Sequence, residues 1–102
     1  MKQFAKKVIL NSKSGYSDKH LQLLDDLIEA GVLLFCAVGK DCEMWHDIMD
    51  EMFVGDGSHE RGYVMITTWH DDEPLEDVLH FARFFHFDDL IEEAETVQVI
   101  EI

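Results

Sequence analysis

The chain alternates short, unbroken apolar runs with stretches in which apolar residues recur every three or four positions. The apolar runs fall within residues 7–11, 32–38, 63–69 and 96–102. Short runs bounded by turn signals predict β-strands, and unbroken ones are typical of parallel strands covered on both faces. We therefore predict four strands over these ranges. The last alternates apolar and polar residues in part, which favours the edge of the sheet.

The three stretches between the strands have the period of amphipathic helices. The predicted inward-facing positions are Leu21, Leu23, Leu24, Leu27 and Ile28 in the first helix, Trp45, Ile48, Met49, Met52 and Phe53 in the second, and Leu75, Val78, Leu79, Ala82 and Phe85 in the third. Gly31 is suited to the end of the first helix, because glycine enters the left-handed region without a steric cost.

Polar residues precede each helix. Ser17 or Asp18 is suited to cap the first helix and Asp41 the second, since their side-chain oxygens can accept from free backbone amides. The run Asp71-Asp72-Glu73-Pro74 predicts the start of the third, with proline in the first turn and the acids favoured by the helix dipole.

This order of elements predicts a single α/β domain over residues 1–102. A mainly parallel four-stranded sheet should lie between helices on both faces, as a three-layer α/β/α sandwich of Rossmann-like or flavodoxin-like type. With strands numbered along the chain, we predict the order 2-1-3-4. The alternative is 3-2-1-4, because residues 32–38 are the most apolar and suit a central strand.

Composition limits the classes of partner. The formal net charge is -14, which argues against non-specific binding to nucleic acid or to an anionic membrane. Residues 71–102 contain eleven acidic residues and one arginine, whereas residues 1–19 contain five lysines and one aspartate. The longest apolar run is too short to span a membrane, and residues 1–11 do not resemble a signal peptide. Cys36 and Cys42 suit reduced thiols, so we expect a soluble, cytoplasmic protein.

Three loops should meet at the carboxyl edge of the sheet, where α/β proteins bind ligands. The first contains Ser12, Lys13, Ser14, Gly15 and Ser17 between a strand and a helix. It resembles the hydroxyl-rich phosphate loop of flavodoxins, whose hydroxyls and amides hold the phosphate of flavin mononucleotide. The resemblance implies a small anionic ligand at this loop, which free helix amides would favour.

Trp69 follows the third apolar run, about where flavodoxins often stack an aromatic residue on the flavin. Lys13 and Lys19 add positive charge near the loop. The alternative interpretation is an ordinary turn that caps the first helix, since serine and glycine are common in turns for conformational reasons alone. We assign no cofactor.

The second loop leads into Cys42 and His46, which are four residues apart and therefore neighbours on a helix. A cysteine in the first helical turn can have a lowered pKa, and Lys40 adds positive charge. The pair could form a reactive thiol with a histidine base, or two zinc ligands with His70 as a third. The alternative is a structural Cys42 at the margin of the apolar stripe. No recognised ligand spacing is present, so we predict no metal site.

The third loop, residues 69–73, is acidic. Magnesium-binding domains of similar topology place an aspartate at the end of the first strand, where this chain has Asn11 and Ser12. Capping of the third helix is therefore the better explanation for the acids.

The leading functional hypothesis is an acidic interaction or regulatory module without catalysis of its own, and a nucleotide-binding domain and a thiol enzyme are the alternatives. We expect a homodimer or a protein partner on the side of the last strand and third helix. Phe81, Phe84, Ile100 and Ile102 are the candidate contacts. Phe84 points away from the helix stripe and is either exposed or covered by residues 88–95; coverage is the preferred interpretation.

Overall fold

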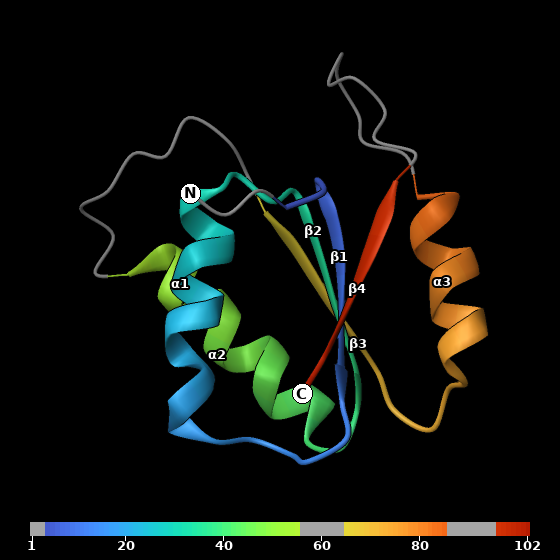
Figure 1. The fold of residues 1–102 in the computed structure, drawn as a ribbon, viewed down its shortest axis with the longest axis horizontal. Helices are drawn as coiled ribbons and strands as arrows, with labels where there is room; N and C mark the ends of the chain where they lie inside the picture. The colour runs from blue at the N-terminus through green and yellow to red at the C-terminus, as the bar shows by residue number, and fades with distance from the viewer. Residues whose placement is uncertain (1–3, 56–64, 86–95) are drawn as a thin grey trace.

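The chain folds into one parallel sheet between two layers of helices, as the sequence predicts (Figure 1). The computed structural model describes residues 4–55, 65–85 and 96–102. The strands are β1 (Lys7–Ser12), β2 (Leu34–Gly39), β3 (Ile66–His70) and β4 (Val97–Glu101). The helices are the short 3-10 helix η1 (Asp18–His20), α1 (Leu21–Glu29), α2 (Cys42–Val54) and α3 (Leu75–Arg83). The connections predicted over residues 55–62 and 88–95 lie outside the described residues, except for Gly55 at the C-cap of α2.

All four strands are parallel, in the order β3-β2-β1-β4. The leading prediction of order 2-1-3-4 is therefore wrong, and the alternative 3-2-1-4 is confirmed. The physical reason is burial: residues 34–38 of β2 are covered on both faces, which requires neighbours on both sides. β4 lies at an edge, as its partial alternation predicts, and β3 forms the other edge.

The two faces of the sheet pack against different helices. Figure 1 shows α1 and α2 on one side of the sheet and α3 on the other. Val8, Leu10, Phe35 and Ala37 face α1 and α2, whereas Ile9, Leu34, Cys36 and Val38 face α3. The predicted stripes are confirmed: Trp45 and Met49 of α2, and Val78 and Ala82 of α3, are fully buried.

The helix starts differ in part from the prediction. Ser17 does cap η1, since its Oγ accepts from the Lys19 amide at 3.4 Å. Asp41 occupies the N-cap position of α2, but its backbone is left-handed (φ 61) and its side chain does not cap the helix. Pro74 lies at the N-cap of α3 rather than in its first turn, so the helix starts directly after residues 71–74, as predicted. The predicted side-chain cap by Asp41 is wrong, whereas the stabilisation of the α3 dipole by the acids before Pro74 stays a prediction.

β1 and β2 approach each other closely where they end, at Ser12 and Gly39. Gly39 has φ +92, and a Cβ at this position would lie 2.3 Å from the Ser12 carbonyl oxygen. The Lys40 amide donates to that oxygen at 2.8 Å. Only glycine allows this approach, which places the first two loops of the carboxyl edge side by side.

Within the described residues, no helix is long and apolar enough to cross a bilayer.

Candidate functional site

Hydrogen bonds hold both ends of the first loop of the carboxyl edge to residues of α2 and of the turn before it. Ser12 is buried, and its Oγ accepts from the indole N–H of Trp45 at 3.0 Å. Trp45 is completely buried and stacks against Tyr16, with ring centroids 4.9 Å apart. The Ser12 hydroxyl therefore satisfies a buried donor of α2, a role that the sequence pattern does not reveal.

The two amides that follow Ser12 are also engaged. Lys13 N–H and Ser14 N–H both donate to the Ile102 carbonyl oxygen, at 2.8 and 3.2 Å. The Lys13 ammonium lies 2.8 Å from Glu101 Oε2. In this arrangement the end of β4 occupies the donors that a phosphate would need.

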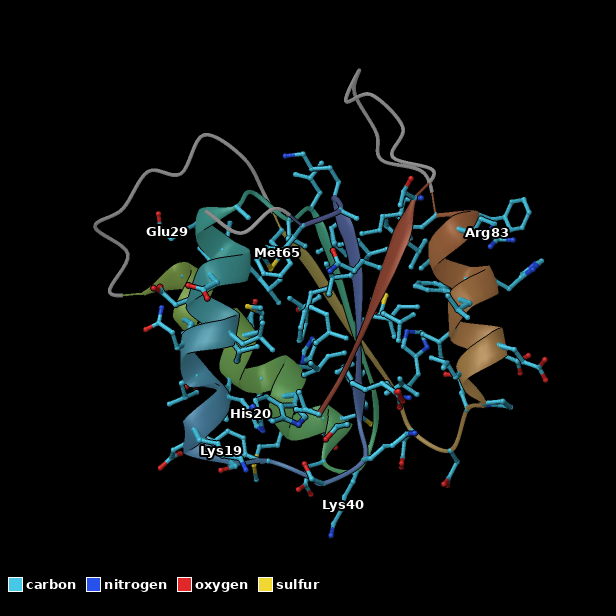
Figure 2. All side chains as sticks on the ribbon, viewed as in Figure 1. Lys19, His20, Glu29, Lys40, Met65 and Arg83 are labelled. Atoms are coloured by element: carbon cyan, nitrogen blue, oxygen red, sulfur yellow. The ribbon has the colours of Figure 1, made fainter. Side chains whose placement is uncertain are left out.

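The remaining part of the loop holds a carboxylate of the protein itself. Tyr16 N–H donates to Asp41 Oδ2 at 2.9 Å, and a Cβ on Gly15 would lie 2.7 Å from the same oxygen. Ser17 is used as the cap of η1. Lys40 is exposed and projects from the carboxyl edge, away from the body of the protein (Figure 2). An anion at this loop would have to displace Asp41 or lie outside it.

Cys42 and His46 begin α2 as predicted, but their environments differ. Cys42 is only 3% exposed, and burial raises the pKa of its thiol; the neighbouring Asp71 charge raises this pKa too, whereas the His70 amide lowers it. His46 Nδ1 lies 3.0 Å from Asp47 Oδ1, and its ring contacts Trp69 in a tilted arrangement, with centroids 4.6 Å apart and an interplanar angle of 54°. The Cys42 thiol is therefore protonated and buried, and the His46 ring contacts Asp47 and Trp69.

His70 is the centre of a polar chain on the face of the sheet that α3 covers. The ring is buried, with Nε2 2.9 Å from Thr68 Oγ1 and Nδ1 2.9 Å from Glu73 Oε2. Its ring also stacks on Phe81, with centroids 4.9 Å apart. Burial raises the pKa of the Cys36 thiol to about 11, although the Thr68 hydroxyl lowers it in part. An acid, a histidine and a hydroxyl in series occur in nucleophilic catalysis. Here, however, the His70 ring and the Cys36 thiol are both buried.

The hydrogen-bonded series of Thr68, His70 and Glu73 was not predicted, although the sequence contains a pattern that indicates it. Thr68 and His70 are two apart in a strand and so share a face, and Glu73 follows three residues later. Among the described residues, no group of histidines, cysteines and acids is arranged to hold a metal ion.

The structural role of Lys7 was not predicted from the sequence either. It begins β1, is only 2% exposed, and its Nζ donates to the carbonyl oxygens of Phe85 at 2.7 Å and Arg83 at 3.3 Å. An ammonium at the end of α3 is favoured by the helix dipole, so Lys7 fixes this helix on the sheet.

Within residues 4–55, 65–85 and 96–102, aromatic side chains are exposed at two places. Trp69 of β3 is 45% exposed beside His46. Phe81 of α3 and Phe84 at its C-cap are 37% and 59% exposed, so the preferred interpretation of Phe84 as covered is wrong. Phe84 stacks on His80, with centroids 4.7 Å apart.

The four predicted contact residues do not form one surface. Ile100 and Ile102 are partly buried against the core under α1 and α2, whereas Phe81 and Phe84 belong to α3, on the opposite face of the sheet. Alternation along β4 causes this separation, because Val97 and Val99 are the residues that face α3.

Comparison with protein-family models matches all of residues 1–102 to the family described as Domain of unknown function (DUF7684). The chain belongs to this family. No curated protein and no solved structure matches the chain. The family description assigns no activity, so the site has to be interpreted from its own geometry.

Proposed function

We propose that this domain acts by binding another protein and has no catalysis of its own. The observation that supports this function is the exposure of Trp69 (45%) and Phe84 (59%) on a chain of net charge -14. Exposed aromatic side chains with polar surroundings are typical of interfaces, in which tryptophan contributes more binding energy than most residues. The cytoplasmic location predicted from the sequence belongs to this proposal, and the two free thiols support it.

The chemistry of the carboxyl edge supports binding over catalysis. A thiol nucleophile needs a lowered pKa and access to a substrate, and Cys42 has a raised pKa and is covered. A phosphate loop needs free amides, and those of Lys13, Ser14 and Tyr16 donate to oxygens of the protein. The nucleotide-binding and thiol-enzyme alternatives are therefore less favoured by the geometry.

A second copy of the chain is the other partner to consider. The outer edge of β4 has no partner strand within the described residues, and two-fold assembly is the commonest form of oligomer. Light scattering at micromolar concentration tests it, together with Phe84→Asp and Ile100→Lys. Because these residues lie on opposite faces of the sheet, a dimer should respond to only one of the two substitutions.

The function is tested by reciprocal capture in the cells that express the protein. A tagged chain is used to identify co-purifying proteins, and each candidate is then purified and titrated against the wild type, Trp69→Ser and Phe84→Ser. The proposal expects a partner whose affinity falls at least tenfold, about 1.4 kcal/mol, in one of the two variants. Gln22→Ser, at an exposed polar position of α1, is the matched control.

The proposal fails if every partner found binds all four proteins equally and light scattering gives a monomer throughout. A turnover of any substrate that depends on Cys42, or on His70, would replace it with an enzymatic function.

A further inference from the structure

Among the residues that the structure describes, the outer edge of β3 is an open strand edge. β3 ends the order β3-β2-β1-β4, and within the described residues no strand lies beyond it. The Ile66 amide donates to the Leu33 carbonyl oxygen at 2.8 Å, toward β2. Because alternate residues of a strand point their backbone groups to opposite sides, the amides and carbonyls of Thr67 and Trp69 are directed outward. An open edge of this kind accepts an additional strand.

Trp69 stands at this edge, on the side of the sheet that α2 covers. It pairs in register with Ala37, whose side chain faces α1 and α2. The indole ring rests against His46, with centroids 4.6 Å apart, and it is still 45% exposed. The ring is therefore held in place by α2 while much of its surface is available to a ligand.

The described segments that form this edge carry charge of one sign. The segments 42–54 and 66–74, which form α2, β3 and the turn after β3, contain seven acidic residues and no lysine or arginine. Glu43, Asp47, Asp71 and Asp72 are exposed. A second copy of this chain would bring like charges together at this edge, whereas a basic segment would be attracted.

We propose that the outer edge of β3 binds an extended, basic segment of a partner protein as an added strand. The segment pairs its backbone with Thr67 and Trp69. One of its lysine or arginine side chains lies on the Trp69 ring, and others meet the carboxylates of α2 and of the turn. Cation–π attraction and charge complementarity then select basic over acidic segments. This inference rests on the proposed function and identifies the class of its partner.

The probe is an acetylated, amidated peptide with alternating lysine and valine, titrated at low salt. The protein has two tryptophans, of which Trp45 is fully buried, so a change in tryptophan emission reports on Trp69. Three control peptides share its length: one with glutamate for lysine, one with N-methylated backbone amides, and one with asparagine for lysine. The proposal expects only the lysine peptide to bind, with an affinity that falls as salt is added.

Variants locate the binding. Trp69→Ser and Thr67→Pro should each weaken the lysine peptide at least tenfold, because the first removes the ring and the second removes an outward amide; proline is tolerated at an edge strand. Peptide binding to Trp69→Ser is followed by calorimetry, since the reporter is lost. Gln22→Ser, at an exposed polar position of α1 on the far side from β3's outer edge residues Thr67 and Trp69, is the control and should bind like the wild type. Circular dichroism spectra and melting temperatures identify any variant that fails to fold.

Equal binding of the lysine and glutamate peptides, or unchanged binding by folded Trp69→Ser, would overturn the inference. Binding of the N-methylated peptide would overturn the added-strand geometry. The result is separable from the proposed function: if a cellular partner depends on Phe84 and no peptide binds at β3, the binding function stands and this inference fails.

Discussion

The hydrogen bond between Trp45 and Ser12 is a direct test of how the first loop is used. The indole N–H donates to Ser12 Oγ at 3.0 Å, and both residues are almost fully buried (0% and 2% exposed). In Ser12→Ala the N–H loses this acceptor in a place that water does not reach. Leaving a buried donor unsatisfied costs about 1–3 kcal/mol.

That cost is large relative to the stability of a domain of this size. Domains have free energies of unfolding of about 5–15 kcal/mol, and each 1 kcal/mol shifts the melting temperature of a domain of about 100 residues by about 4–8 °C. We therefore expect Ser12→Ala to lower the melting temperature by about 4–24 °C. Ser14→Ala, at an exposed serine of the same loop, is the control and should change stability by less than about 0.5 kcal/mol.

A double-mutant cycle isolates the hydrogen bond from the packing. Trp45→Phe removes the N–H, so Ser12→Ala should cost about 1 kcal/mol less in the Trp45→Phe background than in the wild type. Urea unfolding followed by circular dichroism measures the four free energies, because Trp45→Phe removes the buried tryptophan and leaves only the exposed Trp69 as a fluorescence probe. Equal costs of Ser12→Ala in the two backgrounds would refute the assignment of the Ser12 hydroxyl to Trp45.

Three further predictions concern the strand ends and the thiols. Gly39→Ala should prevent folding or cost more than about 4 kcal/mol, because its Cβ would lie 2.3 Å from a backbone oxygen. Gly31→Ala should cost about 1–2 kcal/mol, because its Cβ would meet only the end of a lysine side chain, at 3.4 Å. Similar losses of free energy for the two variants in urea unfolding would contradict this prediction. Cys42 should react with iodoacetamide at pH 8 far more slowly in the folded protein than in urea, because its thiol is buried with a raised pKa; labelling at the rate of free cysteine would contradict it. Burial raises the pKa of Cys36 from 9.0 to about 11. Because the unfolded thiol ionises first, the contribution of the protonated Cys36 to the free energy of unfolding is complete below about pH 9. As the pH rises to 11, this contribution falls by about 2 kcal/mol. Cys36→Ala should lack this part of the alkaline loss, and an unchanged pH profile would refute the shift.

Much of the fold follows from local patterns in the sequence. The apolar runs and the helical periods predict four strands and three helices, because strand and helix periods differ and each hydrophobic face must be buried. The stripe through Trp45 and Met49, and the positive φ of Gly31 at the end of α1, are as predicted. These features depend on residues close together in the chain, for which spacing is sufficient information.

The strand order depends on contacts across the molecule. The leading order was wrong because the length of a connection does not state on which side of β1 a strand will pair. Burial of β2 on both faces decided the matter, since an edge position would have left Phe35 or Cys36 less covered. The separation of Phe84 from Ile100 has the same origin, because it depends on which face of the sheet each helix covers.

The candidate site shows the same division. Composition and spacing determined that acids, serines, Cys42 and Trp69 would gather near the carboxyl edge, because parallel strands all end there. Only the tertiary structure decided that Asp41 and the Ile102 carbonyl fill the first loop and that Trp45 takes the Ser12 hydroxyl. The exposure of Trp69 at the outer edge of β3 likewise depends on the tertiary structure, because it follows from the position of β3 at the end of the described sheet. Which donor meets which acceptor depends on how distant segments pack, and a residue's own neighbours in the chain do not specify that.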